Sequence, residues 1–176
     1  MNTIIKWPLL TRLLHWLSAL LIFGLFGVGL YMTSLTYYDP LYHQLPWWHK
    51  SFGIVLIALI GMRLVRRAMV AGPAGEPGHS AFERVAAKIT HLLLYVVTLL
   101  IGVSGYLIST AEDKGIEVFG WFEIPALITP FEDQADIAGA IHLYLAWALM
   151  ALVALHAAGA IKHHLIDKDN TLKRMI

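Results

Sequence analysis

Four long apolar segments dominate this sequence and restrict the environments in which it can fold. A helix of about 20 apolar residues crosses the hydrocarbon core of a bilayer. We therefore predict membrane spans at about residues 13–32, 48–66, 89–108 and 137–161. The second segment is the shortest, and charged residues lie at its ends. The expected fold is all-α, a transmembrane four-helix bundle formed by residues 1–176 as a single domain.

The amino-acid composition also favours a membrane protein. Hydrophobic residues make up 58% of the chain and charged residues only 14%, with a mean hydropathy of +0.65. A soluble chain of this length has too little interior to hide so much apolar surface. The net charge of +1 gives no basic footprint for nucleic acid. The absence of cysteine excludes disulfides, iron–sulfur clusters, thiolate zinc sites and covalently attached c-type haem.

The distribution of Lys and Arg predicts the orientation of the spans. Eleven of the 13 basic residues lie before the first span, at the end of the second span or between it and the third, or after the fourth, and only Lys50 and Lys114 lie on the other side. Cytoplasmic loops carry the excess of basic residues, so we expect both termini in the cytoplasm. The first span lacks a cleavage motif and is too long for a signal peptide, so we expect it to be retained.

Two of the connections carry local signals. Residues 70–80 (VAGPAGEPGHS) form a Gly/Pro-rich turn, and Ser80 with Glu83 predicts a capping box at the start of the third span. In the longer connection, the stretch 116–128 (IEVFGWFEIPALI) mixes aromatic residues with single acids. We expect that stretch to lie in the interface on the outer face of the membrane.

Five of the nine histidines lie within or at the ends of the predicted spans: His15, His49, His91, His142 and His156. Ionisable residues are rare at such positions and usually have a function. A single histidine at such a position is about as often an interhelical hydrogen-bonding group as a functional residue. The depths of all five histidines in the membrane therefore decide how the set is interpreted.

The depths of four histidines sort them into two pairs. His142 and His156 are fourteen residues apart on one predicted helix, a separation that returns to within about 40° of the same face and spans about 21 Å. His49 lies at the outer level with His142, and His15 at the inner level with His156. Two imidazoles on facing helices can bind one haem iron from both sides, so we predict two b haems per chain.

Other features near these histidines bear on that prediction. Zinc or copper suits the paired histidines poorly, because neither pair includes a carboxylate or a thiolate. A small residue lies three or four positions from each histidine and would leave room for a flat macrocycle. Such residues are common at any transmembrane interface. They are Ala19, Gly53, Gly139 and Gly159.

The roles of the remaining candidates stay open. His91 begins the third span at the inner level, where it could replace His15 as a ligand or hydrogen-bond a haem propionate or a quinone carbonyl. Arg63 could pair with a propionate, whereas Arg66 and Arg67 are interpreted as topology signals that snorkel to the interface. The other histidines lie in loops or the tail and are expected to be solvated: His43, His79, His163 and His164.

The ordered segments of the chain resemble the bacterial cytochrome b561 family over nearly its whole length. The segments are RLLHWLSALLI (12–22), WHKSFGIVLI (48–57), HLLLYVVTLLIGVSGYL (91–107), FGWFEIPAL (119–127) and GAIHLYLAWALMALVALHAAGAIKHHLIDKDNTLKRM (139–175). The resemblance implies a membrane bundle with two b haems, whose ligands correspond to His15, His49, His142 and His156. The third-helix histidine of the family motif matches His91 and is not usually counted as a ligand.

The resemblance also implies a function. Members of the family move electrons between a donor and membrane quinone. For small stand-alone members in the bacterial inner membrane, the resemblance implies that superoxide at the periplasmic face is the donor and ubiquinone is the acceptor. The outer loops are mainly acidic, so attraction of an anionic donor would rest on Lys50 or Lys114. At the inner level His91, Arg12 and Arg63 offer hydrogen-bond donors to a quinone.

Two other classes of protein compete with this interpretation. A membrane cytochrome b subunit of a hydrogenase or dehydrogenase would need a docking surface for a soluble redox partner, which the short loops disfavour. A haem-free transporter or scaffold would use its histidines as interhelical hydrogen-bonding groups, and it would lack the absorption of reduced haem.

Overall fold

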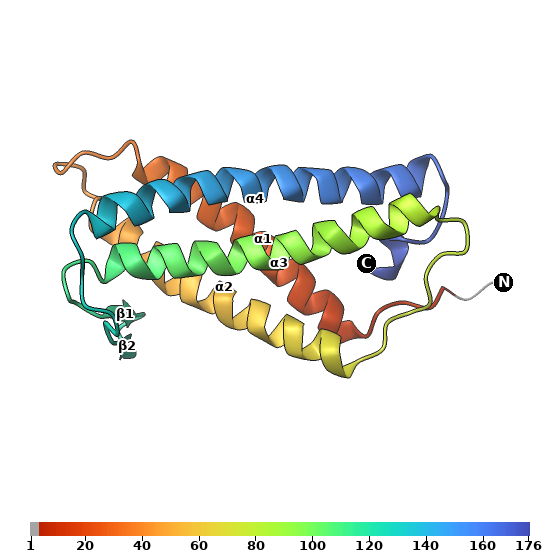
Figure 1. The fold of residues 1–176 in the computed structure, drawn as a ribbon, viewed down its shortest axis with the longest axis horizontal. Helices are drawn as coiled ribbons and strands as arrows, with labels where there is room; N and C mark the ends of the chain where they lie inside the picture. The colour runs from red at the N-terminus through yellow and green to blue at the C-terminus, as the bar shows by residue number, and fades with distance from the viewer. Residues whose placement is uncertain (1–3) are drawn as a thin grey trace.

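Four long helices run alongside one another in an elongated bundle (Figure 1). The structure is a computed structural model, and it describes residues 4–176. The start of the first helix, the connection between the second and third, and the C-terminal 3-10 helix η1 all lie at one end of the bundle. The helices are α1 (Leu9–Met32), α2 (Gln44–Met69), α3 (Ala81–Ser109) and α4 (Gln134–Leu165), and η1 covers Leu172–Arg174.

The helical fold class expected from the sequence is confirmed, and three of the helices are apolar enough to cross a membrane. These are α1, α3 and α4, each of which has an apolar window that is only 11% buried inside the protein. Such exposure of apolar side chains fits lipid as the surrounding solvent. Among residues 4–176, α2 is not one of these helices. Its uncharged stretch between Lys50 and Arg63 is also shorter than the ~20 residues that span a bilayer core. A membrane crossing by α2 therefore stays a prediction.

The start of α3 confirms the predicted capping box. Ser80 Oγ accepts a hydrogen bond from the Glu83 backbone N–H at 3.2 Å, and the Ser80 N–H donates to Glu83 Oε2 at 2.9 Å. These two bonds satisfy N–H groups that have no partner within the helix itself. Helix α3 consequently begins eight residues before the predicted span, at Ala81.

The helices associate as two adjoining pairs. The most extensive backbone contacts join α3 to α4 and α1 to α2, and α2 and α3 connect the pairs. In the part of the chain that the structure describes, the backbone of α4 approaches α1 and α2 only marginally. Large side chains bridge the interval in places, such as Phe26 and Trp147, whose ring centroids are 5.0 Å apart. The bundle is therefore more open between α4 and the α1–α2 pair than within either pair.

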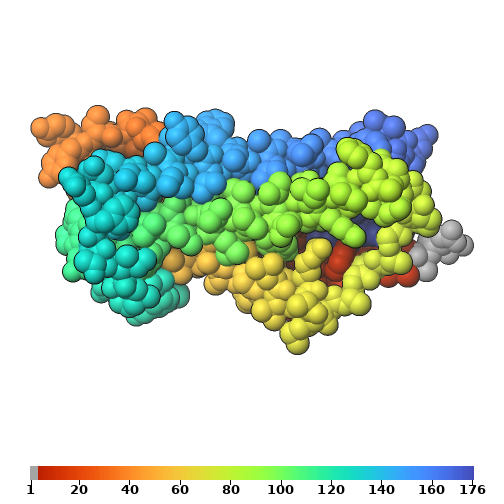
Figure 2. Space-filling view, viewed as in Figure 1, coloured from red at the N-terminus to blue at the C-terminus, as the bar shows by residue number. Residues whose placement is uncertain are grey.

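Part of the long connection between α3 and α4 forms a short antiparallel hairpin. Strand β1 (Ile116–Val118) pairs with β2 (Phe122–Ile124), and Phe119 and Gly120 adopt positive φ angles of 51° and 72° at the turn. The Phe119 N–H donates to Ser51 Oγ on α2 at 3.1 Å. In Figure 2 the region of the hairpin forms a protrusion beside one end of the bundle. The sequence predicted an interfacial segment here but did not indicate strands.

The C-terminal segment closes the opposite end of the bundle by bonding to the start of α1. The Trp7 N–H donates to the Arg174 carbonyl at 3.0 Å. The side chains of Trp16 and Arg12 donate to the carbonyls of Met175 and Ile176 at 2.7 and 2.6 Å. Residues more than 150 positions apart in sequence are thereby held together by three hydrogen bonds.

We expect Ser80→Ala to lower the free energy of unfolding by about 1 kcal/mol, the usual cost of losing an N-cap side chain. Unfolding by SDS in mixed detergent micelles, followed by circular dichroism, measures the change. Ser80→Asp is the control and should retain most of the stability, because aspartate also caps helices. Equal destabilisation by both substitutions would contradict a capping role.

Candidate functional site

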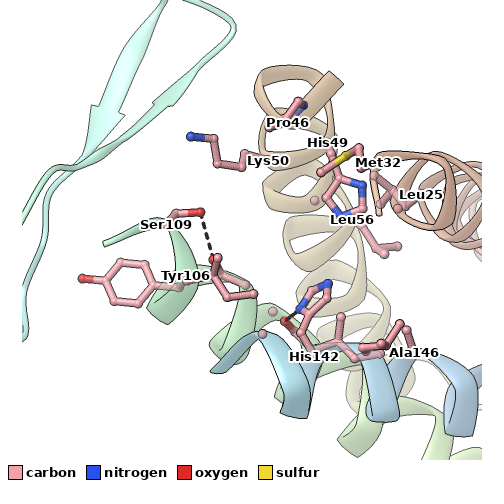
Figure 3. A pocket seen from close by; sticks show the side chains of 18 of the residues that line it. Leu25, Met32, Pro46, His49, Lys50, Leu56, Tyr106, Ser109, His142 and Ala146 are labelled. Atoms are coloured by element: carbon pink, nitrogen blue, oxygen red, sulfur yellow. Dashed lines mark hydrogen bonds between the residues drawn. The ribbon is translucent and has the colours of Figure 1, made fainter. Parts of the chain in front are cut away.

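His49 on α2 and His142 on α4 face one another across a cavity of about 740 Å³. Figure 3 shows the two side chains pointing toward each other from their separate helices. Their ring centroids are 6.2 Å apart. Two imidazoles bound to opposite faces of one metal ion have centroids about 6 Å apart, since each metal–nitrogen bond is about 2 Å long and each ring adds about 1 Å. The sequence predicted this pair, and the spacing fits a shared iron.

Hydrogen bonds to His142 favour one tautomer of its ring. Its Nδ1 lies 3.1 Å from the Ile101 carbonyl oxygen and 3.1 Å from Ser104 Oγ, both on α3. The carbonyl oxygen can only accept, so Nδ1 carries the proton and Nε2 keeps its lone pair. A metal-bound histidine is commonly oriented in this way by a backbone carbonyl. The Nδ1 atom of His49 is buried and has no hydrogen-bond partner within residues 4–176.

Two glycines on neighbouring helices allow the rings their positions. A Cβ atom on Gly29 of α1 would lie 3.3 Å from His49 Cε1, and one on Gly105 of α3 would lie 3.2 Å from His142 Cε1. Sequence reasoning missed both, because it considered small residues only on the helix that carries each histidine. On those helices Gly53 and Gly139 have open space where a Cβ would stand, as the sequence analysis expected.

The second predicted pair also meets, at the end of the bundle that holds the start of α1. The ring centroids of His15 and His156 are 6.1 Å apart. His91 lies nearer to His156, at 5.2 Å, which is less than the roughly 6 Å expected for two imidazoles that share one metal ion. His15 therefore fits the position opposite His156 better than His91 does, and His91 lies beside the pair.

Arg63 connects this second pair to α3. Its Nη2 donates to His15 Nδ1 at 3.1 Å, and its guanidinium lies 5.5 Å from the centroid of the Tyr95 ring. A neutral His15 that bound iron through Nε2 would carry its proton on Nδ1 and could not accept this hydrogen bond. Ligation would therefore release Arg63 to bind another acceptor, such as a carboxylate.

The two lysines near the first pair differ in their surroundings. Both line the 740 Å³ cavity. Lys114 donates to Glu112 Oε2 at 2.7 Å, and this hydrogen bond, aided by Coulomb attraction, raises the pKa of Lys114 and lowers the pKa of Glu112. Lys114 thus has a carboxylate partner. Lys50 makes no ion pair with a carboxylate within residues 4–176.

The expectation of solvated loop histidines is correct for one residue and wrong for three. His43 is exposed, whereas His79, His163 and His164 are half-buried. The reason is the C-terminal segment, which folds back against the α2–α3 connection and stacks the His79 and His163 rings at a centroid distance of 4.2 Å. The spacing of His163 and Asp167, four residues apart, was the sequence signal for part of this cluster.

The arrangement fits haem on structural grounds. A flat macrocycle needs two ligands on facing helices with space between them, and the 740 Å³ cavity beside His49 and His142 supplies that space for the first pair. The helices and the paired histidines together define a membrane protein of the cytochrome b type.

Comparison with known proteins assigns the family. The family model described as prokaryotic cytochrome b561 matches residues 6–176, and the chain belongs to this family, whose members bind haem b. Cytochrome b561 homolog 2 of Escherichia coli (strain K12) is 46% identical over 99% of this chain and 93% of its own length.

Two further relatives are more distant. Cytochrome b561 homolog 1 of the same E. coli strain is 30% identical over 73% of this chain and 72% of its own length. A protein of Yersinia pestis named "Probable superoxide oxidase CybB" is 29% identical over 93% of this chain and 91% of its own length. The family-wide character is thus a membrane cytochrome b that takes part in electron transport.

We expect Gly29→Val to lower the haem content of the purified protein, because the added methyl groups would displace the His49 ring. The haem-to-protein ratio from a pyridine haemochrome assay measures the loss. Gly24→Val on the same helix is the control, since open space surrounds that position, and it should leave the ratio unchanged. The same haem content in both variants would show that the ring tolerates a side chain at position 29.

Proposed function

We propose that this protein is a di-haem b oxidoreductase that passes electrons from superoxide to ubiquinone across a bacterial inner membrane. The observation that carries the proposal is the presence of two facing histidine pairs, with ring centroids 6.2 and 6.1 Å apart, at two levels of one bundle. In the overall reaction two superoxide anions each lose one electron and become O₂. One ubiquinone takes up two electrons and two protons and becomes ubiquinol.

The four histidines hold the cofactors in this proposal. His49 and His142 bind one haem and His15 and His156 bind the other, on two levels of α4 separated by about 21 Å. A bound b haem supplies a one-electron change of iron valence without proton chemistry. The Ile101 carbonyl keeps the proton of His142 on Nδ1, so that Nε2 stays available as the ligand atom. Arg63, which would lose its acceptor on His15, would be available to pair with a haem propionate.

The donor end is the one that carries His49, His142 and the hairpin. Superoxide is an anion, and Lys50 is a cation on the wall of the cavity without a carboxylate partner in residues 4–176. Lys50 therefore attracts the donor locally, although the surrounding loops are mainly acidic. The name of the Yersinia pestis relative supports superoxide as the donor.

The acceptor end is the one that carries His15, His91 and His156. A quinone partitions into lipid, and its carbonyl oxygens gain charge on reduction, which positioned donors stabilise. His91 and Arg12 are both half-buried at this end of the bundle. We assign His91 as the residue that donates a hydrogen bond to the quinone, rather than as an iron ligand.

The orientation follows from the positions of the basic residues. The start of α1, the α2–α3 connection and η1 lie at the acceptor end, and these segments carry most of the Lys and Arg residues. Since basic residues mark the cytoplasmic side, the acceptor end faces the cytoplasm, the donor end faces the periplasm, and α2 crosses the membrane beside the other three helices.

We expect two haems per chain, with His142→Ala and His156→Ala each reducing the number to about one. Each substitution would remove one of the two histidines that hold a single haem, which would weaken binding at that level only. Haem and protein determinations on purified variants measure the stoichiometry. One haem per wild-type chain would refute the pairing, and full haem retention in His156→Ala would refute the ligand role of that residue.

We expect Lys50→Glu to slow the reduction of the purified cytochrome by superoxide roughly tenfold, within the usual range of electrostatic steering. The effect should shrink at high salt, which screens the charge. Lys114→Glu changes the net charge equally and is the matched control, with a smaller effect because Glu112 already pairs with Lys114. Equal slowing by both variants would indicate a general charge effect instead of a site.

We expect His91→Ala to slow the reoxidation of the reduced cytochrome by ubiquinone while both haems remain bound. Stopped-flow spectra with and without quinone measure the rate, and the haem content of the same sample tests retention. Loss of one haem in His91→Ala would show that His91 is a ligand, and the assignment of His15 would then be wrong.

A further inference from the structure

A cluster of polar side chains lies outside the haem-type site, where the C-terminal segment meets the α2–α3 connection. His79 Nε2 lies 2.7 Å from Asp169 Oδ2, and His163 Nδ1 lies 3.7 Å from the same oxygen. Asp167 Oδ2 is 2.6 Å from His163 Nδ1. All of these side chains are mostly shielded from solvent, with 14–18% of the side chain exposed for His79, His163 and Asp169 and 32% for Asp167.

We propose that His79, His163 and Asp169 form a binding site for a zinc-type divalent metal ion. One ligand atom from each of these three residues lies within 4.8 Å of the others. In a tetrahedral zinc site with bonds of about 2.1 Å, ligand atoms lie about 3.4 Å apart. The distances of 2.7 and 3.7 Å from Asp169 to the two imidazoles bracket this value, so only small side-chain movements convert the cluster into a coordination shell.

The two imidazoles lie side by side, next to one carboxylate. Their rings stack with an interplanar angle of 28° and a centroid distance of 4.2 Å, so that a nitrogen of each ring lies near the Asp169 carboxylate. In the metal-free state protons occupy the hydrogen bonds between rings and carboxylates. A bound metal ion replaces these protons and takes the nitrogen lone pairs, because histidine binds metals in its neutral form.

The charges around the cluster favour a cation. The adjacent pocket of about 340 Å³ is lined by four carboxylates, those of Glu76, Glu83, Asp167 and Asp169. Three basic side chains balance part of this charge: Lys162 contacts Glu83 and Asp167, Arg174 contacts Glu76, and Arg84 donates to the His79 carbonyl. The carboxylates still outnumber the basic side chains by four to three, so the cluster favours a cation. His, Asp and Glu are also the ligand types that zinc accepts in a chain without cysteine.

A metal ion here would join segments that are distant in sequence. His79 and Asp169 are 90 residues apart, and Asp169 precedes the residues whose carbonyls bond to Trp7, Arg12 and Trp16. Binding would therefore stabilise the folded-back position of the C-terminal segment, since a ligand that binds only the folded arrangement stabilises that arrangement. The site is independent of haem and of the electron donor.

Zinc binding by the full-length holoprotein in detergent tests the proposal. After treatment with EDTA, the protein is equilibrated with zinc and a chromogenic chelator, and zinc and iron are counted by mass spectrometry. We expect one zinc per wild-type chain in addition to the haem iron. His79→Gln, His163→Gln and Asp169→Asn should each weaken binding by at least about 100-fold, more than the loss of an outer-shell partner usually costs. His43→Gln, at an exposed position, is the matched control and should bind zinc as wild type does.

A rescue variant distinguishes ligation from a structural effect of the substitutions. His79→Cys supplies a thiolate, which is also a zinc ligand, and it should recover zinc binding that His79→Gln loses. Each variant is compared at equal iron content, so that a misfolded variant is recognised. Wild-type protein that holds no zinc against the chelator, or variants that hold it as tightly as His43→Gln, would overturn the proposal, as would a failure of His79→Cys to bind more tightly than His79→Gln.

Discussion

The hydrocarbon core of a bilayer offers no hydrogen-bonding partners, so the polar groups of a membrane protein must find partners within the protein. Backbone groups in a bilayer core must be paired within their own helix, and several polar side chains here do the same. Ser18 donates to the Leu14 carbonyl at 2.7 Å and Thr98 to the Leu94 carbonyl at 2.6 Å. An imidazole has two ring nitrogens, and two of the half-buried histidines take a partner from another helix. His142 bonds to α3 and His15 to α2, so these two histidines help to hold neighbouring helices together.

The unequal packing of the helices determines how the paired histidines are placed. Within the α1–α2 and α3–α4 pairs the backbones approach closely, but between α4 and the first pair they do not. The bundle thus keeps an interval whose two sides carry imidazoles at matching heights. Tight packing there would bring imidazoles into direct contact and leave no space for a group between them. The glycines that approach His49 and His142 lie within the close pairs, which steers both rings toward the interval.

Sequence reasoning found what depends on local patterns. Apolar length located the helices, the Ser80–Glu83 spacing gave the capping box, and the separation of His142 and His156 indicated two levels on one face. It did not find the hairpin, whose turn is anchored by a hydrogen bond from Phe119 to Ser51 on another helix. It also treated His79 and His163 as solvated, because their burial depends on the C-terminal segment folding back on a connection some 90 residues earlier. Contacts of that range leave no periodic signature in the sequence.

Helix α4 contributes one histidine to each pair, whereas the partners come from two different helices, His49 from α2 and His15 from α1. A helix of this length behaves as a nearly rigid rod, and His142 and His156 project within about 40° of one direction. A rotation of α4 about its axis, or a translation along that axis, therefore moves both imidazoles together. The geometry of the two levels can be adjusted separately only through α1 or α2. Because α4 is shared, a movement of that helix changes both histidine pairs. A movement of α1 or α2 changes only the pair to which that helix contributes.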